Sequence, residues 1–564
     1  MAGHGGSIGH GGGTGGADPK VFGTEGQACA SLGALACAGP SQQQTLICNA
    51  GTWRALSTCP TNQRCDRTSG VCTDVAAGCD GQEPGFSVCE TASVARACGP
   101  DLVTLVDTMC PGVCASGACQ GAACGDGTVE GAEECDDGNT IAADGCEPDC
   151  TRTQVLALAA GRAHTCALLS HGNVRCWGEN SQGQLGMGTS QDRSGLQPYQ
   201  NDLVGLGGPA MTVAAGGDHT CALMADASMR CWGANDHGQL GLGTTAALGD
   251  DELPATAAPI ALDRPVTAIA AGGNVTCAIL DDGSLRCWGQ NNYGQLGLGH
   301  TRDIGDDELP TRAIATVSVG GPALLAATGG NHTCVMLAEG VGTCFGLNGL
   351  GQLGLGITQN VGDTDVPSDV PPFMFPSATG LFTQLVVGAS RACALDSTGT
   401  VWCWGDNSDG GLGLNFVGAD PTRKANEWGF WSWTGTPPLR IDAGGYHLCV
   451  NLSSGVLRCW GINDKGQLGL PTTNTLGDDD QLVDVAPIDL GLDGNGFPSY
   501  PWTETAGAAH TCALLDGGDV RCWGANESGQ LGFGYASAPP TDYVGGTPDT
   551  VPGKEPAINI VSSR

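Results

Sequence analysis

Seven pairs of cysteines, each pair ten positions apart, recur after residue 152 and restrict what this chain can fold into. The phrase AGGNVTCAILDDGSLRCWGQNNYGQLGLG at 271–299 is one copy of the surrounding motif, and near-copies contain the other six pairs. Tandem copies of this kind predict a repeat architecture with one structural unit per copy. The pairs are Cys166 and Cys176, Cys221 and Cys231, Cys277 and Cys287, Cys334 and Cys344, Cys393 and Cys403, Cys449 and Cys459, and Cys512 and Cys522.

The spacing within each pair predicts a β-hairpin. When the hairpin of the third copy is centred on Asp282, Cys277 and Cys287 face each other across the two strands. The three-residue loop then ends on Gly283, where the backbone must be left-handed, a conformation that glycine adopts without strain. Glycine holds this position in every copy except the second, which has Ala227.

Cysteines that face each other across a hairpin are close enough to form a disulfide. Each bond would contribute up to about 2–3 kcal/mol by closing a short loop. The alternative is seven dithiol metal sites, but no histidine or second cysteine pair stands near enough in sequence to complete a tetrahedron. We therefore expect seven disulfides, and with them an oxidising compartment.

Each copy contains about four strand-like segments, which in the third copy are 266–270, 276–280, 284–288 and a segment after Pro310. Neither face of the hairpins has a solvent-like composition, so each sheet needs a neighbour on both sides. Blades stacked around an axis provide this, and the sequence predicts an all-β, seven-bladed β-propeller over 152–564. We expect the last segment, 557–561, to join the first blade near 155–159 and to close the ring by strand sharing.

The motif GxxHTCAL followed by RCWGxNxxGQLGxG resembles the regulator of chromosome condensation repeat family over about 410 residues. The resemblance implies a seven-bladed propeller closed by strand sharing. It also implies, as an alternative function, guanine-nucleotide exchange on a small GTPase. The chain departs from the nuclear members of the family because it is acidic and carries a cysteine pair in every blade.

The chain before residue 152 is organised differently. We expect a flexible Gly-rich linker over 1–27, disulfide-rich modules over 28–73 and 74–120, and a four-cysteine Asp-rich repeat over 121–151. Sixteen of the 30 cysteines lie here, in even groups of six, six and four, and their connectivity stays open. No secretory apolar segment opens the sequence, so we expect a signal or lipoprotein sequence, and with it a possible lipid anchor, upstream of Met1.

The segment CGDGTVEGAEECDDGNTIAADGCEPDC resembles a cysteine-rich repeat of large secreted myxobacterial proteins, which suggests a bacterial surface origin. Its oxygen donors lie close in sequence and form a candidate Ca²⁺ site. The alternative is that these residues only make turns, because Asp and Asn bond readily to nearby backbone. The candidate ligands are Asp126, Asp136, Asp137, Asn139, Asp144 and Asp149.

One insert, NEWGFWSWTG at 426–435, is dense in aromatics for a chain with only 5% of them. Aromatic clusters on loops often anchor a binding partner. The alternative is that they pack between blades or fill the channel. The candidate binding residues are Trp428, Phe430, Trp431 and Trp433.

Three further patterns repeat with the blades. Acidic inserts such as LGDDELP at 248–254 and IGDDELP at 304–310 should cluster on one face, as solvated loops or as an acidic, calcium-binding rim. GQLGLG lacks the Lys-Ser/Thr of a phosphate loop and is interpreted as the turn leaving each blade. One slot is histidine in five copies, and we expect these side chains to bond neighbouring backbone: His164, His219, His332, His447 and His510.

The net charge of −35, with only four lysines, excludes the basic face that nucleic-acid binding requires. No run of 18 apolar residues encodes a transmembrane helix, and no catalytic motif stands out. We therefore expect a non-enzymatic propeller that is extracellular or displayed on a bacterial surface and binds a protein partner. Nucleotide exchange is the alternative, and a propeller enzyme has only fold analogy behind it.

Overall fold

The computed structural model describes residues 133–561 apart from 312–314, 376–380, 415–416, 419, 429, 432–434, 479–484, 494–495 and 536–542. Before residue 133 it describes ten short strands and a few single positions. The described residues divide into two compact units, one over 154–560 and the other before residue 154. No helix in the described part of the chain is long and apolar enough to span a bilayer.

The smaller unit contains three-stranded sheets β1-β2-β3 and β6-β7-β8 and the pairs β4-β5 and β9-β10, all antiparallel. The cysteine pairings of the modules expected over 28–73 and 74–120, which the sequence leaves open, lie outside the described residues, as does the linker over 1–27. The strands are β1 (Leu35–Cys37), β2 (Gln44–Asn49), β3 (Thr52–Thr58), β4 (Gln63–Cys65), β5 (Cys72–Asp74), β6 (Ser87–Thr91), β7 (Val94–Cys98), β8 (Leu105–Met109), β9 (Val113–Ala115) and β10 (Ala118–Gln120).

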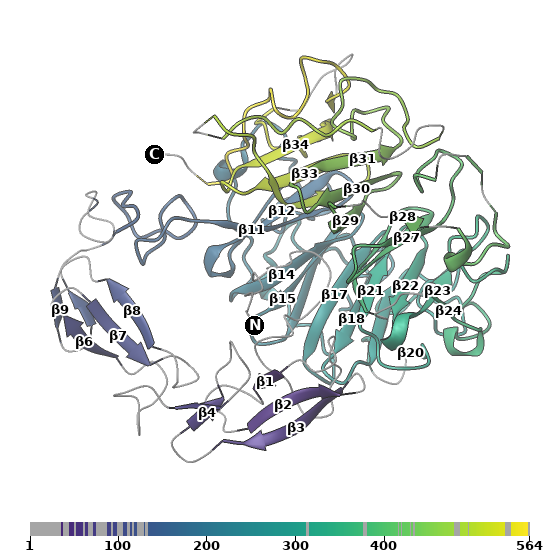
Figure 1. Cartoon of the computed structure of the whole chain (residues 1–564), viewed down its shortest axis with the longest axis horizontal. Coiled ribbons are helices and arrows are strands. Elements are labelled where there is room, and N and C mark those ends of the chain that lie inside the picture. Colours follow the sequence, from purple (N-terminus) through teal and green to yellow (C-terminus); the bar gives the residue numbers. More distant parts are fainter. Residues whose placement is uncertain are drawn as a thin grey trace. The chain divides into compact units, whose positions relative to one another are not determined.

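The larger unit consists of seven antiparallel sheets, which we call blades 1 to 7 in chain order (Figure 1). Blade 1 contains β11 (Val155–Ala160), β12 (His164–Leu169) and β13 (Val174–Gly178), and blade 2 contains β14 (Ala210–Ala215), β15 (His219–Met224) and β16 (Met229–Gly233). Blade 3 contains β17 (Val266–Gly272), β18 (Val275–Leu280), β19 (Leu285–Gly289) and β20 (Thr316–Val317); blade 4 contains β21 (Leu325–Thr328), β22 (His332–Met336), β23 (Val341–Gly346) and β24 (Phe373–Met374); and blade 5 contains β25 (Phe382–Val387), β26 (Arg391–Asp396), β27 (Val401–Gly405) and β28 (Phe430–Trp431). Blade 6 contains β29 (Pro438–Ala443), β30 (His447–Leu452) and β31 (Leu457–Gly461), and blade 7 contains β32 (Pro501–Ala506), β33 (His510–Leu515), β34 (Val520–Ala525) and β35 (Tyr543–Val544).

The all-β prediction is confirmed, and single turns of 3₁₀ helix are the main departures from strands and loops. These turns are η1 (Ser170–Gly172), η2 (Pro198–Gln200), η3 (Pro254–Thr256), η4 (Ala338–Gly340), η5 (Pro367–Asp369) and η6 (Ala425–Glu427). In three-stranded blades 1, 2 and 6 the expected fourth strand is reduced to one backbone hydrogen bond, such as that from Val204 N–H to the carbonyl of Val174 at 2.9 Å.

The hairpin in each blade has the geometry that the cysteine spacing predicts. Cys277 lies opposite Cys287 in the register of β18 and β19. Gly283 closes the loop of this hairpin at φ +77°, and Ala227 adopts the same left-handed conformation in blade 2 at φ +63°, although it carries a side chain.

Each of the seven cysteine pairs is joined as a disulfide, with the two Cα atoms 4.0–4.2 Å apart. The structure therefore contains cross-strand disulfides at the positions where the sequence predicts them, and not dithiol metal sites. The bonds join Cys166 to Cys176, Cys221 to Cys231, Cys277 to Cys287, Cys334 to Cys344, Cys393 to Cys403, Cys449 to Cys459, and Cys512 to Cys522.

Neighbouring blades are connected by a buried hydrogen-bond relay. The imidazole of His164 in blade 1 bonds the hydroxyl of Thr220 in blade 2 at 2.9 Å. That hydroxyl donates to the carbonyl of Gln184, which also accepts the indole N–H of Trp232, both at 3.0 Å. Three more junctions have the same relay: His219–Thr276–Gln239–Trp288, His447–Thr511–Gln467–Trp523 and His510–Thr165–Gln530–Trp177.

The histidine slot is therefore structural, although its partner differs from the one we expected. Four of the five imidazoles bond a threonine side chain of the next blade, and the threonine passes the connection on to a backbone carbonyl. The fifth, His332, has Ala392 at the corresponding position of the next blade and lacks this bond. Burial lowers the pKa of His164, His447 and His510 to about 3 and that of His219 to about 4, so these rings are neutral at neutral pH.

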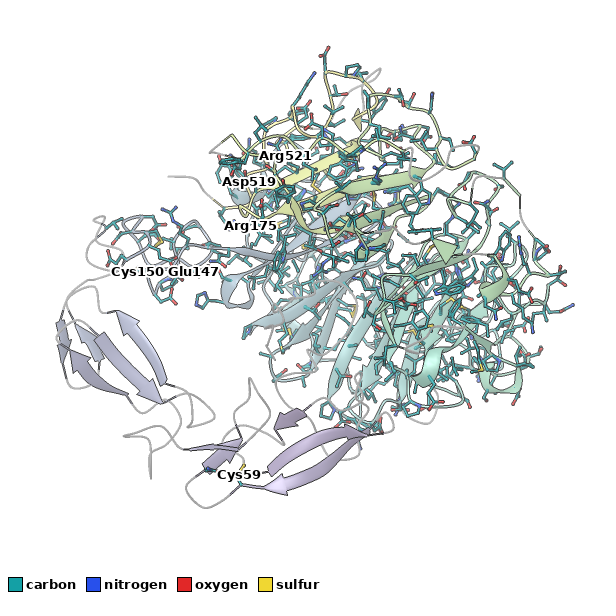
Figure 2. The ribbon with its side chains drawn as sticks, viewed as in Figure 1. Cys59, Glu147, Cys150, Arg175, Asp519 and Arg521 are labelled. Atoms are coloured by element: carbon teal, nitrogen blue, oxygen red, sulfur yellow. A yellow bond between two sulfur atoms is a disulfide. The ribbon has the colours of Figure 1, made fainter. Side chains whose placement is uncertain are left out.

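Blades 7 and 1 pack through the same contacts as the other neighbours, although they are far apart in sequence. His510 and Trp177 complete a relay across this junction, and Ala508 N–H donates to the carbonyl of Gly161 at 3.2 Å. The guanidinium of Arg175, labelled in Figure 2, donates to the carbonyl of Ile560 at 2.5 Å.

The predicted closure by strand sharing is not confirmed. We expected 557–561 to pair with the first strand of blade 1. Instead, Ile558 N–H donates to the carbonyl of Val520 in β34 at 2.8 Å, so this segment takes the fourth-strand position of its own blade. Asn559 then accepts a backbone hydrogen bond from Tyr199 of blade 1 at 3.1 Å.

The GQLGLG segments form the turns that leave the blades. In blade 1, Leu185 is fully buried, and its N–H donates to the side-chain carbonyl of Asn180 at 2.9 Å. The same asparagine-to-leucine bond recurs in every blade. These turns therefore act as buried anchors for the blade junctions.

Candidate functional site

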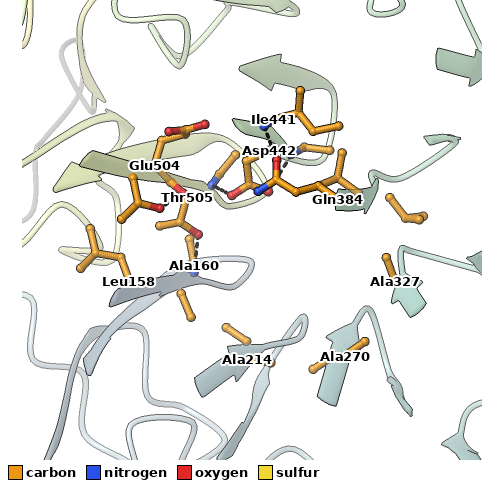
Figure 3. Close-up of a pocket in the computed structure, with 18 of the residues that line it drawn as sticks. Leu158, Ala160, Ala214, Ala270, Ala327, Gln384, Ile441, Asp442, Glu504 and Thr505 are labelled. Atoms are coloured by element: carbon orange, nitrogen blue, oxygen red, sulfur yellow. Dashed lines mark hydrogen bonds between the residues drawn. The ribbon is translucent and has the colours of Figure 1, made fainter. Parts of the chain in front are cut away.

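The first strands of all seven blades line one cavity of about 140 Å³ on the axis of the unit (Figure 3). Each blade contributes two to four residues, from Leu158–Ala160 in blade 1 to Thr503–Ala506 in blade 7. A cavity at the centre of radially arranged blades is the usual location for a propeller channel. Its lining and its two ends are therefore the candidate sites.

The lining is apolar on one side and polar on the other. A glycine follows each first strand, except in blade 3, where the glycine is the last residue of the strand. Two positions before this glycine, blades 1 to 4 have alanine, whereas blades 6 and 7 have Asp442 and Thr505. Three polar side chains on this side accept backbone N–H groups of the next blade: Gln384 from Ile441 at 2.8 Å, Asp442 from Ala506 at 3.0 Å and Thr505 from Ala160 at 3.2 Å (Figure 3).

A charged cluster lies on the same side, between blades 6 and 7. Burial raises the pKa of Asp442 and of Glu504 to about 7 in each case, and the positive charge of Arg440 offsets part of this effect. Burial also lowers the pKa of Arg440, and the two carboxylates counteract that shift. Glu504 accepts a hydrogen bond from Asn451 at 3.4 Å. The cluster is thus bonded into the junction between the two blades.

One end of the cavity, where the seven hairpin turns lie, carries a series of β-bulges. In every blade except blade 4 the first strand contains one unpaired extra residue opposite the end of the second strand. A bulge directs such a residue out of the ladder. In blades 3 and 5 it is Thr267 and Thr383, whose hydroxyls donate back to their own blade at 3.0 and 3.3 Å.

In the other four blades the bulge residue is large, apolar and exposed. Its exposed fraction is 58% for Leu439, 45% for Trp502, 45% for Leu156 and 62% for Met211. These residues belong to blades 6, 7, 1 and 2, which follow one another around the axis. We call this set the bulge arc. Tyr500, which is 44% exposed, precedes the strand that carries Trp502.

The acidic inserts leave the blades at the opposite end. Leu248 and Ile304 bridge Gly233 and Gly289, the last residues of their third strands. In two adjacent blades an insert brings three carboxylates within 4.8 Å of one another: Asp250, Asp251 and Glu252, and Asp306, Asp307 and Glu308. Burial and the neighbouring aspartates raise the pKa of Glu252 and of Glu308 to about 7.

The structure gives the two described tryptophans of the aromatic insert packing contacts. Trp428 is buried, and Arg423 lies over its ring at 5.0 Å. Trp431 lies edge-on to Trp460 with ring centroids 4.7 Å apart, and its indole N–H donates to the carbonyl of Leu412 at 3.3 Å. The side chain of Phe430 and all of Trp433 lie outside the described residues.

The candidate calcium ligands bond mainly to nearby backbone. Asp136, Asp137 and Asp149 each accept an N–H two residues further on, at 2.8–3.2 Å, and Asn139 donates to Asp144 at 3.1 Å. Among the described residues, only the two insert triplets bring three carboxylates together. Asp126 lies outside that part of the chain.

Within the same module only one of the two possible disulfides is present. Cys135 bonds Cys146, whereas Cys124 and Cys150 are free thiols. Cys150 donates to the carboxylate of Glu133 at 3.3 Å, and Figure 2 labels Cys150 beside Glu147. The even number of cysteines predicted two bonds.

Sequence reasoning missed the bulge arc and the charged cluster. A signal for both exists in the first strand of each copy. When the copies are aligned on the glycine after that strand, Glu504 stands where five other blades have Leu, Val or Ile and one has Ala. Charged residues in an otherwise apolar strand mark the cluster, and a large apolar residue five places before the glycine marks the arc.

Comparisons with known proteins agree with this geometry. The model of the RCC1-like domain matches residues 80–425, more than half of the chain, and the regulator of chromosome condensation (RCC1) repeat matches 505–530. The chain belongs to the RCC1-like domain family of β-propeller proteins.

Two curated relatives illustrate the range of the family. The ultraviolet-B receptor UVR8 of Arabidopsis thaliana is 28% identical over 393 residues, which cover 68% of this chain and 79% of the receptor. The probable E3 ubiquitin-protein ligase HERC4 of Homo sapiens is 33% identical over 208 residues, or 37% of this chain and 19% of the ligase. The match therefore spans about a fifth of HERC4. Among solved structures, Prp20p of Saccharomyces cerevisiae aligns with a TM-score of 0.49 at 22% identity, covering 64% of this chain and 83% of Prp20p.

Proposed function

We propose that the propeller is a non-enzymatic protein-binding platform. The observation that carries this proposal is the contrast between a uniform frame and variable exposed turns. The frame repeats the same disulfides, while the seven hairpin turns at one end differ in sequence: Ser-His-Gly, Ala-Asp-Ala, Asp-Asp-Gly, Ala-Glu-Gly, Ser-Thr-Gly, Ser-Ser-Gly and Asp-Gly-Gly. Variable loops on a rigid scaffold are the usual design of a recognition surface.

The chemistry of the channel supports binding over catalysis. The polar side chains Gln384, Asp442 and Thr505 bond to backbone of the neighbouring blade. A catalytic acid or base must be free to reach a substrate atom. These groups instead stabilise the packing of blades 5, 6, 7 and 1.

The disulfides support a secreted or surface-displayed location, and the resemblance of residues 124–150 to a myxobacterial cysteine-rich repeat supports a bacterial one. Seven disulfides in one propeller require an oxidising compartment to form and persist. Mass spectrometry of the chain alkylated before reduction tests this. We expect all fourteen propeller cysteines to be protected from alkylation. Mostly free thiols would overturn the location and favour nucleotide exchange on a small GTPase.

The binding function is tested by capture with the full, oxidised chain immobilised. Fractions of the host's culture medium and envelope are passed over it, and retained proteins are purified and titrated back. We expect at least one partner to bind saturably and without chemical change to either protein. A chain that retains no protein, or that accelerates nucleotide release from a small GTPase, would contradict the proposal.

A further inference from the structure

We propose that the bulge arc is the docking surface of this platform, and that its partner is a protein whose surface presents apolar side chains flanked by lysine and arginine. This inference rests on the proposed function and adds to it the place of binding and the chemistry of the partner. It is carried by three independent features: exposure, charge and support.

The first feature is exposure at a position that the fold does not require to be apolar. Blades 3 and 5 build the same bulge with threonine, whose hydroxyl satisfies a carbonyl of its own blade. Leucine, tryptophan and methionine at that position leave 45–62% of each residue in solvent without serving the ladder. Grouped exposed apolar residues are a mark of interaction sites, and tryptophan is prominent among the residues that dominate binding energy.

The second feature is charge. Two of the four hairpin turns beside the arc carry an exposed carboxylate, Asp226 in blade 2 and Asp516 in blade 7, and exposed Asp519 directly follows the turn of blade 7. The chain as a whole has a net charge of −35. Complementary potentials favour encounter with positively charged surfaces and suppress encounter with acidic ones. An apolar arc among carboxylates therefore fits a partner that is both apolar and basic.

The third feature is the bonded framework that holds the bulge arc in place. The arc crosses three junctions, between blades 6 and 7, 7 and 1, and 1 and 2, and each of these has the complete histidine–threonine relay. The disulfide of each blade fixes the hairpin beside the bulge. A surface that is already ordered loses less entropy on binding.

The probe is a phage-displayed library of short random peptides, selected on the immobilised, oxidised full chain. We expect the selected peptides to be rich in Lys or Arg together with aromatic or aliphatic residues, and their affinity to fall as salt is raised. The double variant L439S/W502S should lower affinity about tenfold or more. The matched control L253S/L309S changes two leucines of similar exposure, 42% and 41%, in the acidic inserts, and should bind as the wild type does.

Each other outcome has a defined meaning, provided that the variants melt at the wild-type temperature. If L253S/L309S abolishes binding and L439S/W502S does not, the arc is excluded while protein binding stands. Selection of acidic or uncharged peptides at the arc overturns the partner chemistry. A dimer in solution that L439S/W502S dissociates identifies a second copy of this chain as the occupant and overturns the proposed partner class. Failure to select any specific peptide, together with failure to retain any protein, would remove the binding function itself.

Discussion

The junctions on the two sides of the propeller differ in how they are bonded. The four junctions between blades 6 and 7, 7 and 1, 1 and 2, and 2 and 3 all contain the complete histidine–threonine–glutamine–tryptophan relay. The three junctions that involve blades 4 and 5 do not. Val275 replaces the histidine of blade 3, Ala392 replaces the threonine of blade 5, and Arg391 replaces the histidine of blade 5.

The irregular junctions show two ways of losing the relay. Between blades 5 and 6, Arg391 is fully buried and forms an ion pair with Asp409 at 2.7 Å, while Gly411 leaves the space for the guanidinium that glutamine fills elsewhere. Between blades 4 and 5 the relay is incomplete: Ala392 offers His332 no hydroxyl, and the indole N–H of Trp404 has no hydrogen-bond partner among the described residues. The bulge arc lies entirely on the regular side. The comparison therefore suggests that regular junctions are kept where a surface must be rigid.

The largest expected effect comes from the irregular side. Arg391→Ala removes the only ion-pair partner of Asp409 within the described residues and leaves a carboxylate that is 15% exposed without compensation. We expect a loss of about 3–5 kcal/mol in the free energy of unfolding. Urea titration followed by tryptophan fluorescence measures it.

The control for this variant is Arg264→Ala. Arg264 also pairs with carboxylates, Asp281 and Asp282, but its side chain is 42% exposed. Exposed ion pairs contribute about 0–1 kcal/mol, so the control should remain close to wild type. Equal losses in the two variants would show that burial does not distinguish these pairs.

The next effect is expected on the regular side. Thr220→Val keeps the shape of the side chain but deprives buried His164 of its partner and the carbonyl of Gln184 of one donor. We expect a cost of about 1–3 kcal/mol. Thr267→Val, which removes the hydroxyl of an exposed residue bonded within its own blade, should cost less. If the two variants had the same melting temperature, the proposed stabilising role of the relay would be wrong.

The hairpins and their repetition in seven blades could be predicted from sequence, whereas the individual contacts between blades could not. The hairpins follow from the ten-residue cysteine spacing and one loop position, such as Gly283. The contact between blades 7 and 1 joins residues 345 positions apart, Thr165 and His510, and no local pattern indicates it. The bulge was missed because one unpaired residue, such as Leu156, barely disturbs the alternation of a strand.

The charged cluster gives an effect that depends on pH. The pKa of Glu504 is raised to about 7 in the folded chain, above its ordinary value of 4.5, so its ionisation opposes folding. Its contribution is favourable at low pH and is lost as pH rises from about 4.5 through 7. Glu504→Gln should therefore raise the urea midpoint relative to wild type at pH 8 and leave it unchanged at pH 4. A constant difference at both pH values would contradict a raised pKa.

The smallest expected effect is a gain, and it tests the comparison from the other direction. Ala392→Thr places a hydroxyl between His332 and the carbonyl of Gln352, the geometry that Thr220 has in blade 2. Because a buried hydrogen bond contributes about 0.5–1.5 kcal/mol, the variant should melt at a higher temperature by the corresponding amount. The same change should slow hydrogen exchange of the amides in β22 and β26, and leave β12 and β15, whose relay is already complete, unaffected. A lower melting temperature would mean that the junction between blades 4 and 5 has repacked around alanine, so that its irregularity is a fixed property of that side and not a missing bond.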